Sequence, residues 1–167
     1  MSALAVVRID MDILLLTIGK TKTRFVCEGI DEYTGRLKRY VPFSLLELPD
    51  IRTTKTMTEQ RQKEQEGELI LSRLTPGDFV VLLDERGREY SSMEFASYME
   101  KTMASGRKRV VFVVGGPYGF SQEVYARADA KLSLSRMTFN HEMVRMFFVE
   151  QIYRAMTILR HEPYHHE

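Results

Sequence analysis

A glycine-rich segment is the first feature of the sequence that could support chemistry. Residues 115–119 (GGPYG) follow an apolar run and precede a helical pattern. Glycines at such a junction let a ligand approach the backbone closely. The segment lacks the G-x-G-x-x-G spacing and the lysine of a phosphate-binding loop. Two interpretations stay open: one wall of a site for a nucleoside-like ligand, or a tight turn between strand and helix.

Polar side chains within the apolar segment 141–160 form a second candidate group. His141 and Arg145 are one helical turn apart and therefore share a face. Arg154 lies beside Tyr153 in strongly apolar surroundings, where an arginine usually requires a partner or a ligand. The Met and Phe residues of the segment favour packing, in a core or a dimer interface, over a cofactor site.

The C-terminal tail forms a third group, in which His161, His165 and His166 raise the question of a metal site. Pro163 prevents one continuous helix, and no acidic or cysteine cluster supplies the spacing of metal ligands, so we predict no metal. With Tyr164, the tail suits stacking on a nucleobase and contact with phosphate. The alternative is an unstructured C-terminus.

Apolar runs that alternate with helical patterns must position these residues. Strands are predicted over residues 12–18, 43–48, 79–83, 110–114 and 131–135, and helices over 24–40, 58–74, 92–104, 121–129 and 141–160. This alternation indicates an α/β domain with a mostly parallel sheet. Asp84 follows the third strand, where it could bind a ribose or a cation or simply cap a turn. One domain is predicted for residues 11–167, and residues 1–10 read as an extension before Met11.

Composition and charge limit the classes of function. The 167 residues carry 24 Lys and Arg against 23 Asp and Glu, a formal net charge of +1. A polyanionic partner would therefore have to meet a local basic patch or arrive as a shaped assembly. The single cysteine, Cys27, favours a reducing, cytoplasmic setting. No apolar run approaches the roughly 20 residues of a membrane span, so we predict no contact with a membrane.

Several segments together resemble the RlmH family, the small SPOUT-class methyltransferases that modify a pseudouridine of large-subunit ribosomal RNA. The matching segments are DILLLTIGK, VVLLDERGREYSS, VVFVVGGPYG, LSLSRMTFNHEMVR and EQIYRAMTILRHEPYHHE. The resemblance covers residues 11–167. It implies an α/β SPOUT fold with a C-terminal trefoil knot, which periodicity cannot show. One departure is Asn140, where the family usually has proline, although Asn is also a good residue to begin a helix.

The resemblance implies a homodimer, S-adenosylmethionine as cofactor, and ribosomal RNA within the ribosome as partner. The cofactor contacts carried over by matching motif are Leu83, Gly115, Leu134, Ser135, Arg136, Met137, Thr138 and Phe139. They fall at the carboxyl ends of three strands, where α/β proteins bind ligands.

The expected reaction is methylation at N3 of the pseudouridine. Arg154 and His165 are the expected catalytic residues, and His141, Tyr164 and His165 are expected to contact the substrate. A nearby cation favours the anion of a weakly acidic imide, and a histidine has a pKa in the range needed to accept its proton. The alternative is a non-catalytic, ribosome-associated RNA-binding module of the same fold.

Overall fold

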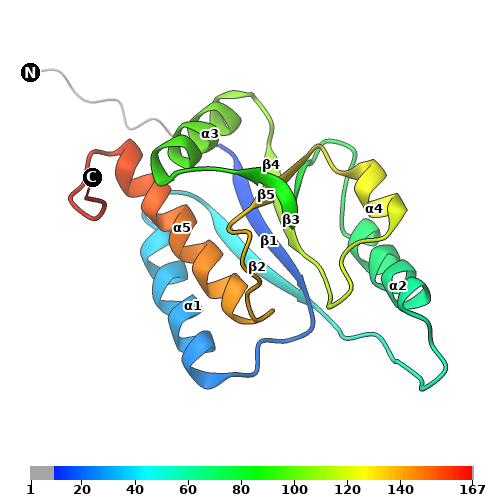
Figure 1. Cartoon of the computed structure of the whole chain (residues 1–167). Coiled ribbons are helices and arrows are strands. Elements are labelled where there is room, and N and C mark those ends of the chain that lie inside the picture. The colour runs from blue at the N-terminus through cyan, green and yellow to red at the C-terminus, as the bar shows by residue number, and fades with distance from the viewer. Residues whose placement is uncertain (1–9, 167) are drawn as a thin grey trace, which may run out of the picture.

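The structure, a computed structural model, describes residues 10–166 and shows one parallel sheet in the order β2-β1-β4-β3-β5 (Figure 1). Its strands are β1 Asp12–Ile18, β2 Phe43–Leu48, β3 Phe79–Glu89, β4 Arg109–Val114 and β5 Ala130–Ser133. The helices are α1 Arg24–Leu37, α2 Glu59–Ser72, α3 Ser92–Ala104, α4 Gln122–Arg127 and α5 Met143–Leu159. The predicted α/β class with a parallel sheet is confirmed. The predicted extension over residues 1–10 falls almost wholly outside the described residues.

Helices cover both faces of the sheet, with α1, α3 and α5 on one face and α2 and α4 on the other (Figure 1). Successive side chains of a strand point to opposite faces. In β1, Ile13 and Leu15 therefore join the core beneath the three helices, and Leu14 and Leu16 join the core beneath the other two. Burial on both faces explains why the strands appear in the sequence as continuous apolar runs. Among residues 10–166, no helix has the length and apolar character needed to cross a membrane.

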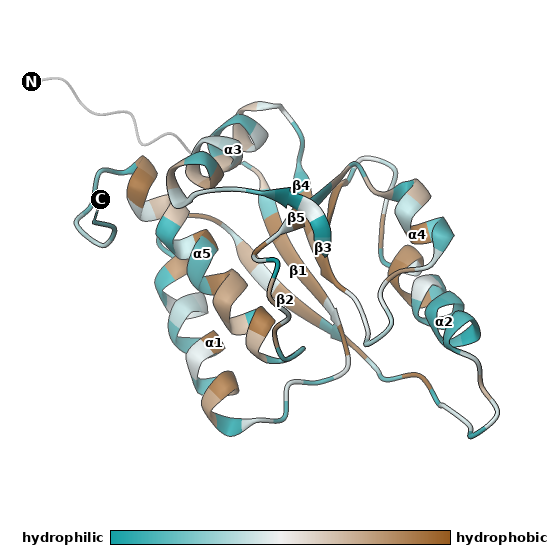
Figure 2. Cartoon of the chain, viewed as in Figure 1, coloured by the Kyte–Doolittle hydropathy of each residue, from teal (hydrophilic) through white to brown (hydrophobic). Residues whose placement is uncertain are grey.

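Strand β3 continues beyond the turn predicted after residue 83. Both Leu83 and Arg88 pair with Leu132 of β5, so the register shifts by a bulge between them. The residues of this extension are polar, and they form hydrogen bonds with the edge strand β5 instead of joining the core. Figure 2 shows this end of β3 in teal, the colour of hydrophilic residues. Gly87 lies so close to β5 that a Cβ there would be 2.6 Å from the backbone N and C of Leu132. The hydropathy pattern did not predict the extension, because its side chains lie outside the hydrophobic core and are therefore not apolar.

A methyl group added at Gly87 is expected to destabilise the fold. We expect Gly87→Ala to lower the free energy of unfolding by about 1–3 kcal/mol, since β3 and β5 would have to separate. Urea denaturation followed by circular dichroism measures this change. Gly77→Ala is the matched control, because no atom lies within 4 Å of a Cβ at that position. Equal stability of the two variants would contradict a tight crossing of β3 and β5.

A buried ion pair joins Asp78 at the start of β3 to Arg109 at the start of β4. Asp78 is only 3% exposed, and Arg109 donates to its carboxylate from Nε at 2.8 Å and from Nη2 at 2.6 Å. The backbone N–H of Thr75 donates to it at 2.7 Å. Burial acts to raise the pKa of Asp78, but the hydrogen bonds from Arg109 and Thr75 outweigh burial and hold the pKa below 3.8.

This ion pair predicts a loss of stability in acid. A carboxyl group whose pKa is lower in the folded state stabilises the fold above its unfolded pKa, and this contribution disappears as the pH falls through the folded pKa. We therefore expect the free energy of unfolding to decrease below about pH 4. Asp78→Asn should remove part of that decrease in urea titrations between pH 7 and pH 3, whereas Asp31→Asn, at an exposed site, should not. Parallel pH curves for Asp78→Asn and the wild type would contradict this assignment.

Candidate functional site

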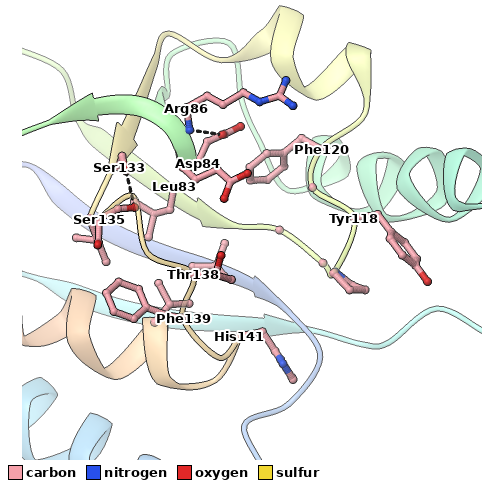
Figure 3. A pocket seen from close by; sticks show the side chains of 18 of the residues that line it. Leu83, Asp84, Arg86, Tyr118, Phe120, Ser133, Ser135, Thr138, Phe139 and His141 are labelled. Carbon is pink, nitrogen blue, oxygen red and sulfur yellow. Dashed lines mark hydrogen bonds between the residues drawn. The ribbon is translucent and has the colours of Figure 1, made fainter.

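A cavity of about 490 Å³ lies at the carboxyl ends of β4 and β5, beside the bulge of β3 (Figure 3). We call it the donor cavity. Its volume falls in the range of small-molecule sites, and it occupies the end of the sheet where α/β proteins bind ligands. Its walls come from Leu83 and Asp84 in β3, from the glycine-rich loop after β4, and from the segment between β5 and α5.

The donor cavity gathers seven of the eight residues predicted to contact a cofactor. These are Leu83, Gly115, Leu134, Ser135, Met137, Thr138 and Phe139, and His141 lines the same space. The eighth, Arg136, does not line it; its side chain is 89% exposed and lies 3.6 Å from Glu89. The turn after β5 is fixed internally, since Ser133 Oγ donates to the Ser135 carbonyl at 3.0 Å. Ser135 Oγ in turn accepts from the Met137 N–H at 2.9 Å.

The glycine-rich loop after β4 is both a tight turn and a wall of the donor cavity. Gly119 has a φ of +86°, the left-handed region that favours glycine. A Cβ at Gly115 would lie 2.9 Å from the ring of Phe120. The loop is therefore both a tight turn and a wall of the cavity. The same glycines that allow the turn leave the backbone beside the cavity without side chains.

The donor cavity combines acidic groups with an apolar wall. Asp84 accepts a hydrogen bond from the Arg86 N–H at 2.8 Å and another from the Tyr125 hydroxyl. Burial, and then the hydrogen bond to Asp84, raises the pKa of Tyr125 to about 12, so this hydroxyl stays protonated as a donor at neutral pH. The predicted turn is wrong, because Asp84 lies within the bulge of β3, and its carboxylate faces the cavity together with Glu85. Because Lys63 and Arg86 line the same cavity, its side chains suit a ligand that carries charges of both signs and an aromatic ring.

Arg154, Tyr164 and His165 form a second cluster, which we call the tail cluster. Arg154 Nη1 lies 3.1 Å from His165 Nδ1, and the guanidinium lies 4.8 Å from the centre of the Tyr164 ring. Glu150, which the sequence analysis did not single out, accepts from Arg154 Nη2 at 2.7 Å and from the Tyr164 hydroxyl at 2.8 Å. The described part of the tail therefore packs against α5, which contradicts the alternative of an unstructured C-terminus.

One chain does not bring the two groups together. The donor cavity is lined by His141, just before α5 begins, whereas Arg154 of the tail cluster lies toward the other end of that helix. Figure 1 shows that the C-terminus lies beside this second end of α5. An α-helix rises 1.5 Å per residue, so His141 and Arg154 are roughly 20 Å apart along the axis. The residues predicted for the cofactor and those predicted for catalysis occupy separate places in the chain.

Arg145 fixes the start of α5, a role that sequence reasoning missed. It is 1% exposed. Its guanidinium donates to the carbonyls of Ile18 at 2.7 Å and Gly19 at 2.8 Å, and it contacts Glu47 Oε2 at 3.1 Å. Nearby, Glu142 accepts from the backbone N–H of Thr23 at 3.0 Å. These contacts join α5 to the loop after β1 and so hold His141 at the wall of the donor cavity.

Comparison with known proteins identifies the family. A family model described as "Predicted SPOUT methyltransferase" matches residues 11–165. The chain belongs to this SPOUT methyltransferase family. A relative from Parabacteroides distasonis, named "Ribosomal RNA large subunit methyltransferase H", is 58% identical over 94% of this chain and 100% of its own length. Relatives of the same name from Porphyromonas gingivalis and Flavobacterium johnsoniae are each 54% identical over the same shares. These matches confirm the family resemblance that the sequence segments indicate.

Proposed function

We propose that this SPOUT methyltransferase transfers a methyl group from S-adenosylmethionine to N3 of a pseudouridine in large-subunit ribosomal RNA. We further propose that its substrate is the assembled ribosome, in the cytoplasm. The observation that carries the proposal is the donor cavity, which gathers seven of the eight residues that the family motif assigns to the cofactor. The shared name of the relatives supports ribosomal RNA as the substrate class. The trefoil knot implied by the resemblance stays a prediction.

The residues of the donor cavity fit S-adenosylmethionine. Leu83, Leu134 and Phe139 offer apolar surface to the adenine ring, and the carboxylates of Asp84 and Glu85 offer acceptors for hydroxyl groups and for positive charge. When bound, S-adenosylmethionine supplies a methyl group attached to a positively charged sulfur. The chain has to hold that methyl group in line with the attacking nitrogen and exclude water.

The tail cluster supplies the groups that suit the nucleobase. N3 of pseudouridine belongs to a weakly acidic imide, and a guanidinium beside it stabilises its anion. We assign this role to Arg154, which Glu150 orients through Nε at 3.1 Å and Nη2 at 2.7 Å. We assign acceptance of the N3 proton to His165, which lies against Arg154. Tyr164 is proposed to contact the target nucleotide, and His141 to contact it from the side of the donor cavity.

A homodimer would unite the donor cavity of one subunit with the tail cluster of its partner. The separation of the two clusters in one chain supports this arrangement. Apolar side chains beside the donor cavity support it as well, since Met137 is 77% exposed, Phe139 37% and Phe147 38%. The rings of Phe139 and Phe147 lie against each other with centroids 5.2 Å apart. Exposed apolar groups that gather in this way are typical of interfaces.

Two measurements test the proposed function. Calorimetry with S-adenosylmethionine should show binding to the wild-type chain. Labelled methyl groups should then be transferred to ribosomes that lack this modification, but not to ribosomes that already carry it. No binding of S-adenosylmethionine would exclude the methyltransferase. Transfer to free unmodified RNA but not to ribosomes would exclude the assembled particle as substrate, and ribosome binding without any transfer would favour the RNA-binding module.

A further inference from the structure

Glu66 is a buried carboxylate to which the proposed reaction gives no role. It lies in α2, whose other glutamates are more exposed, and only 3% of Glu66 is accessible. Ionised side chains are seldom buried without a partner. Yet none of the ion pairs formed among residues 10–166 includes Glu66. The buried position of this carboxylate therefore depends on other contacts.

Two neighbours contact the Glu66 carboxylate. Gln62 Nε2, one turn earlier in α2, donates to Oε1 at 3.1 Å. The carboxylate also packs against the backbone of Gly116 in the glycine-rich loop. The loop is shaped around the carboxylate, because a Cβ at position 116 would overlap both Glu66 oxygens. Glu66 therefore contacts the glycine-rich loop from the side of α2.

The loop segment in contact with Glu66 separates two cavities. One is the donor cavity, and the other, of about 380 Å³, is lined by Glu66, Gln62, the loop after β1 and the start of α5. The residues that line both cavities are Gly115, Gly116, Pro117 and His141. Any shift of this segment would therefore change the shape of the donor cavity.

The position of Gly116 gives the contact a function. Gly116 lines both cavities, and the Glu66 carboxylate leaves its backbone no room to move toward α2. We propose that Glu66 is a positioning residue that holds the glycine-rich loop at Gly116 and so shapes the binding site of the methyl donor. This inference rests on the proposed function of the donor cavity.

The contact itself can be tested without any ligand, with Glu66→Gln as the variant. Protonation of Glu66 removes a negative charge that lies against the backbone of Gly116, so the amide proton resonance of Gly116 should shift as the pH falls through the pKa of Glu66. Burial, and then the charge of Asp50, raises the pKa of Glu66 above 4.5, although Gln62 and Gly116 oppose this shift. The other charged and titratable groups that line the two cavities are Lys20, Lys22, Asp50, Lys63, Asp84, Glu85, Arg86, Tyr118, Tyr125, His141, Glu142 and Arg145. These groups remain in Glu66→Gln. Any part of the pH-dependent shift of the Gly116 amide that this variant loses is therefore caused by Glu66.

The positioning role is tested by the affinity for S-adenosylmethionine, measured by calorimetry. We expect Glu66→Gln to raise Kd about tenfold, because the amide NH2 that replaces one carboxylate oxygen would face either Gln62 Nε2 or the Gly116 backbone and displace the loop. The value of kcat at saturating S-adenosylmethionine should change much less. Glu68→Gln is the matched control, since it makes the same substitution at an exposed position of the same helix. A purely structural role would lower the melting temperature of Glu66→Gln and leave Kd unchanged.

The outcomes separate this inference from the proposed function. If the wild type binds S-adenosylmethionine and Glu66→Gln binds it equally well, the positioning role is overturned. It is also overturned if the Gly116 amide shows no titration that depends on Glu66. If the wild type binds no S-adenosylmethionine, the proposed function fails and the positioning role fails with it, while the amide titration still decides whether the contact exists.

Discussion

Replacing Arg145 by methionine is expected to lower the free energy of unfolding by about 3–5 kcal/mol, the range for breaking a buried ion pair. Methionine leaves the carbonyls of Ile18 and Gly19 and the carboxylate of Glu47 without the guanidinium that now donates to them. A buried acceptor that loses its donor still carries its full desolvation penalty, because no hydrogen bond replaces those it made with water. The melting temperature should fall on the order of 10 °C, as measured by calorimetry and urea denaturation.

Two further variants sharpen the Arg145 prediction. Arg136→Met removes an arginine whose side chain is 89% exposed, so its stability should match the wild type. Glu47→Gln keeps a hydrogen-bonding side chain at a position that is 27% exposed, so it should cost less than Arg145→Met. A loss below about 1 kcal/mol for Arg145→Met would show that the start of α5 does not depend on this guanidinium.

Replacing Arg154 by alanine is expected to lower kcat about 10²–10³-fold, the usual cost of removing one group that stabilises a developing anion. The Kd of S-adenosylmethionine should change far less, because Arg154 does not line the donor cavity of its own chain and its proposed contact is with the nucleobase. Transfer of labelled methyl groups to unmodified ribosomes at saturating substrate measures kcat, and calorimetry measures Kd.

The control for Arg154 is Arg160→Ala, at an exposed arginine beyond the same end of α5. It removes a cation that lies over the Tyr40 ring at 4.7 Å rather than over Tyr164. Turnover should be close to that of the wild type. Unchanged turnover of Arg154→Ala at saturating substrate would remove Arg154 from the reaction and leave its contact with Glu150 as a structural one.

Local patterns were enough to predict the sheet and the edge of it at which a ligand would bind. Runs such as residues 110–114 are apolar because both faces of the sheet are covered, and that property is written in the sequence itself. The glycine-rich loop and the segment 134–139 follow two such strands, so their place at one edge of a parallel sheet followed from the fold class. The family resemblance then supplied the individual cofactor contacts and the proposed ligand, S-adenosylmethionine.

The parts that were missed depend on contacts between distant segments. Arg145 and Glu47 are 98 positions apart in the chain, and no local pattern pairs them. Glu66 appears in the sequence as one acidic residue among several in a polar helix, and its burial depends on where the loop after β4 lies. The extension of β3 pairs with an edge strand, so its polar side chains gave no hydrophobic signal.

The length of α5 sets the distance between the donor cavity and the tail cluster. This helix carries the edge of the donor cavity at its start and the tail cluster at its end, and it acts as a rigid spacer between them. Each residue inserted or removed would shift one cluster by 1.5 Å and rotate it by about 100° relative to the other. In the proposed homodimer, that offset would occur at both sites where the donor cavity of one subunit meets the tail cluster of its partner. Changes in side chains along α5 should therefore be tolerated far better than changes in its number of residues.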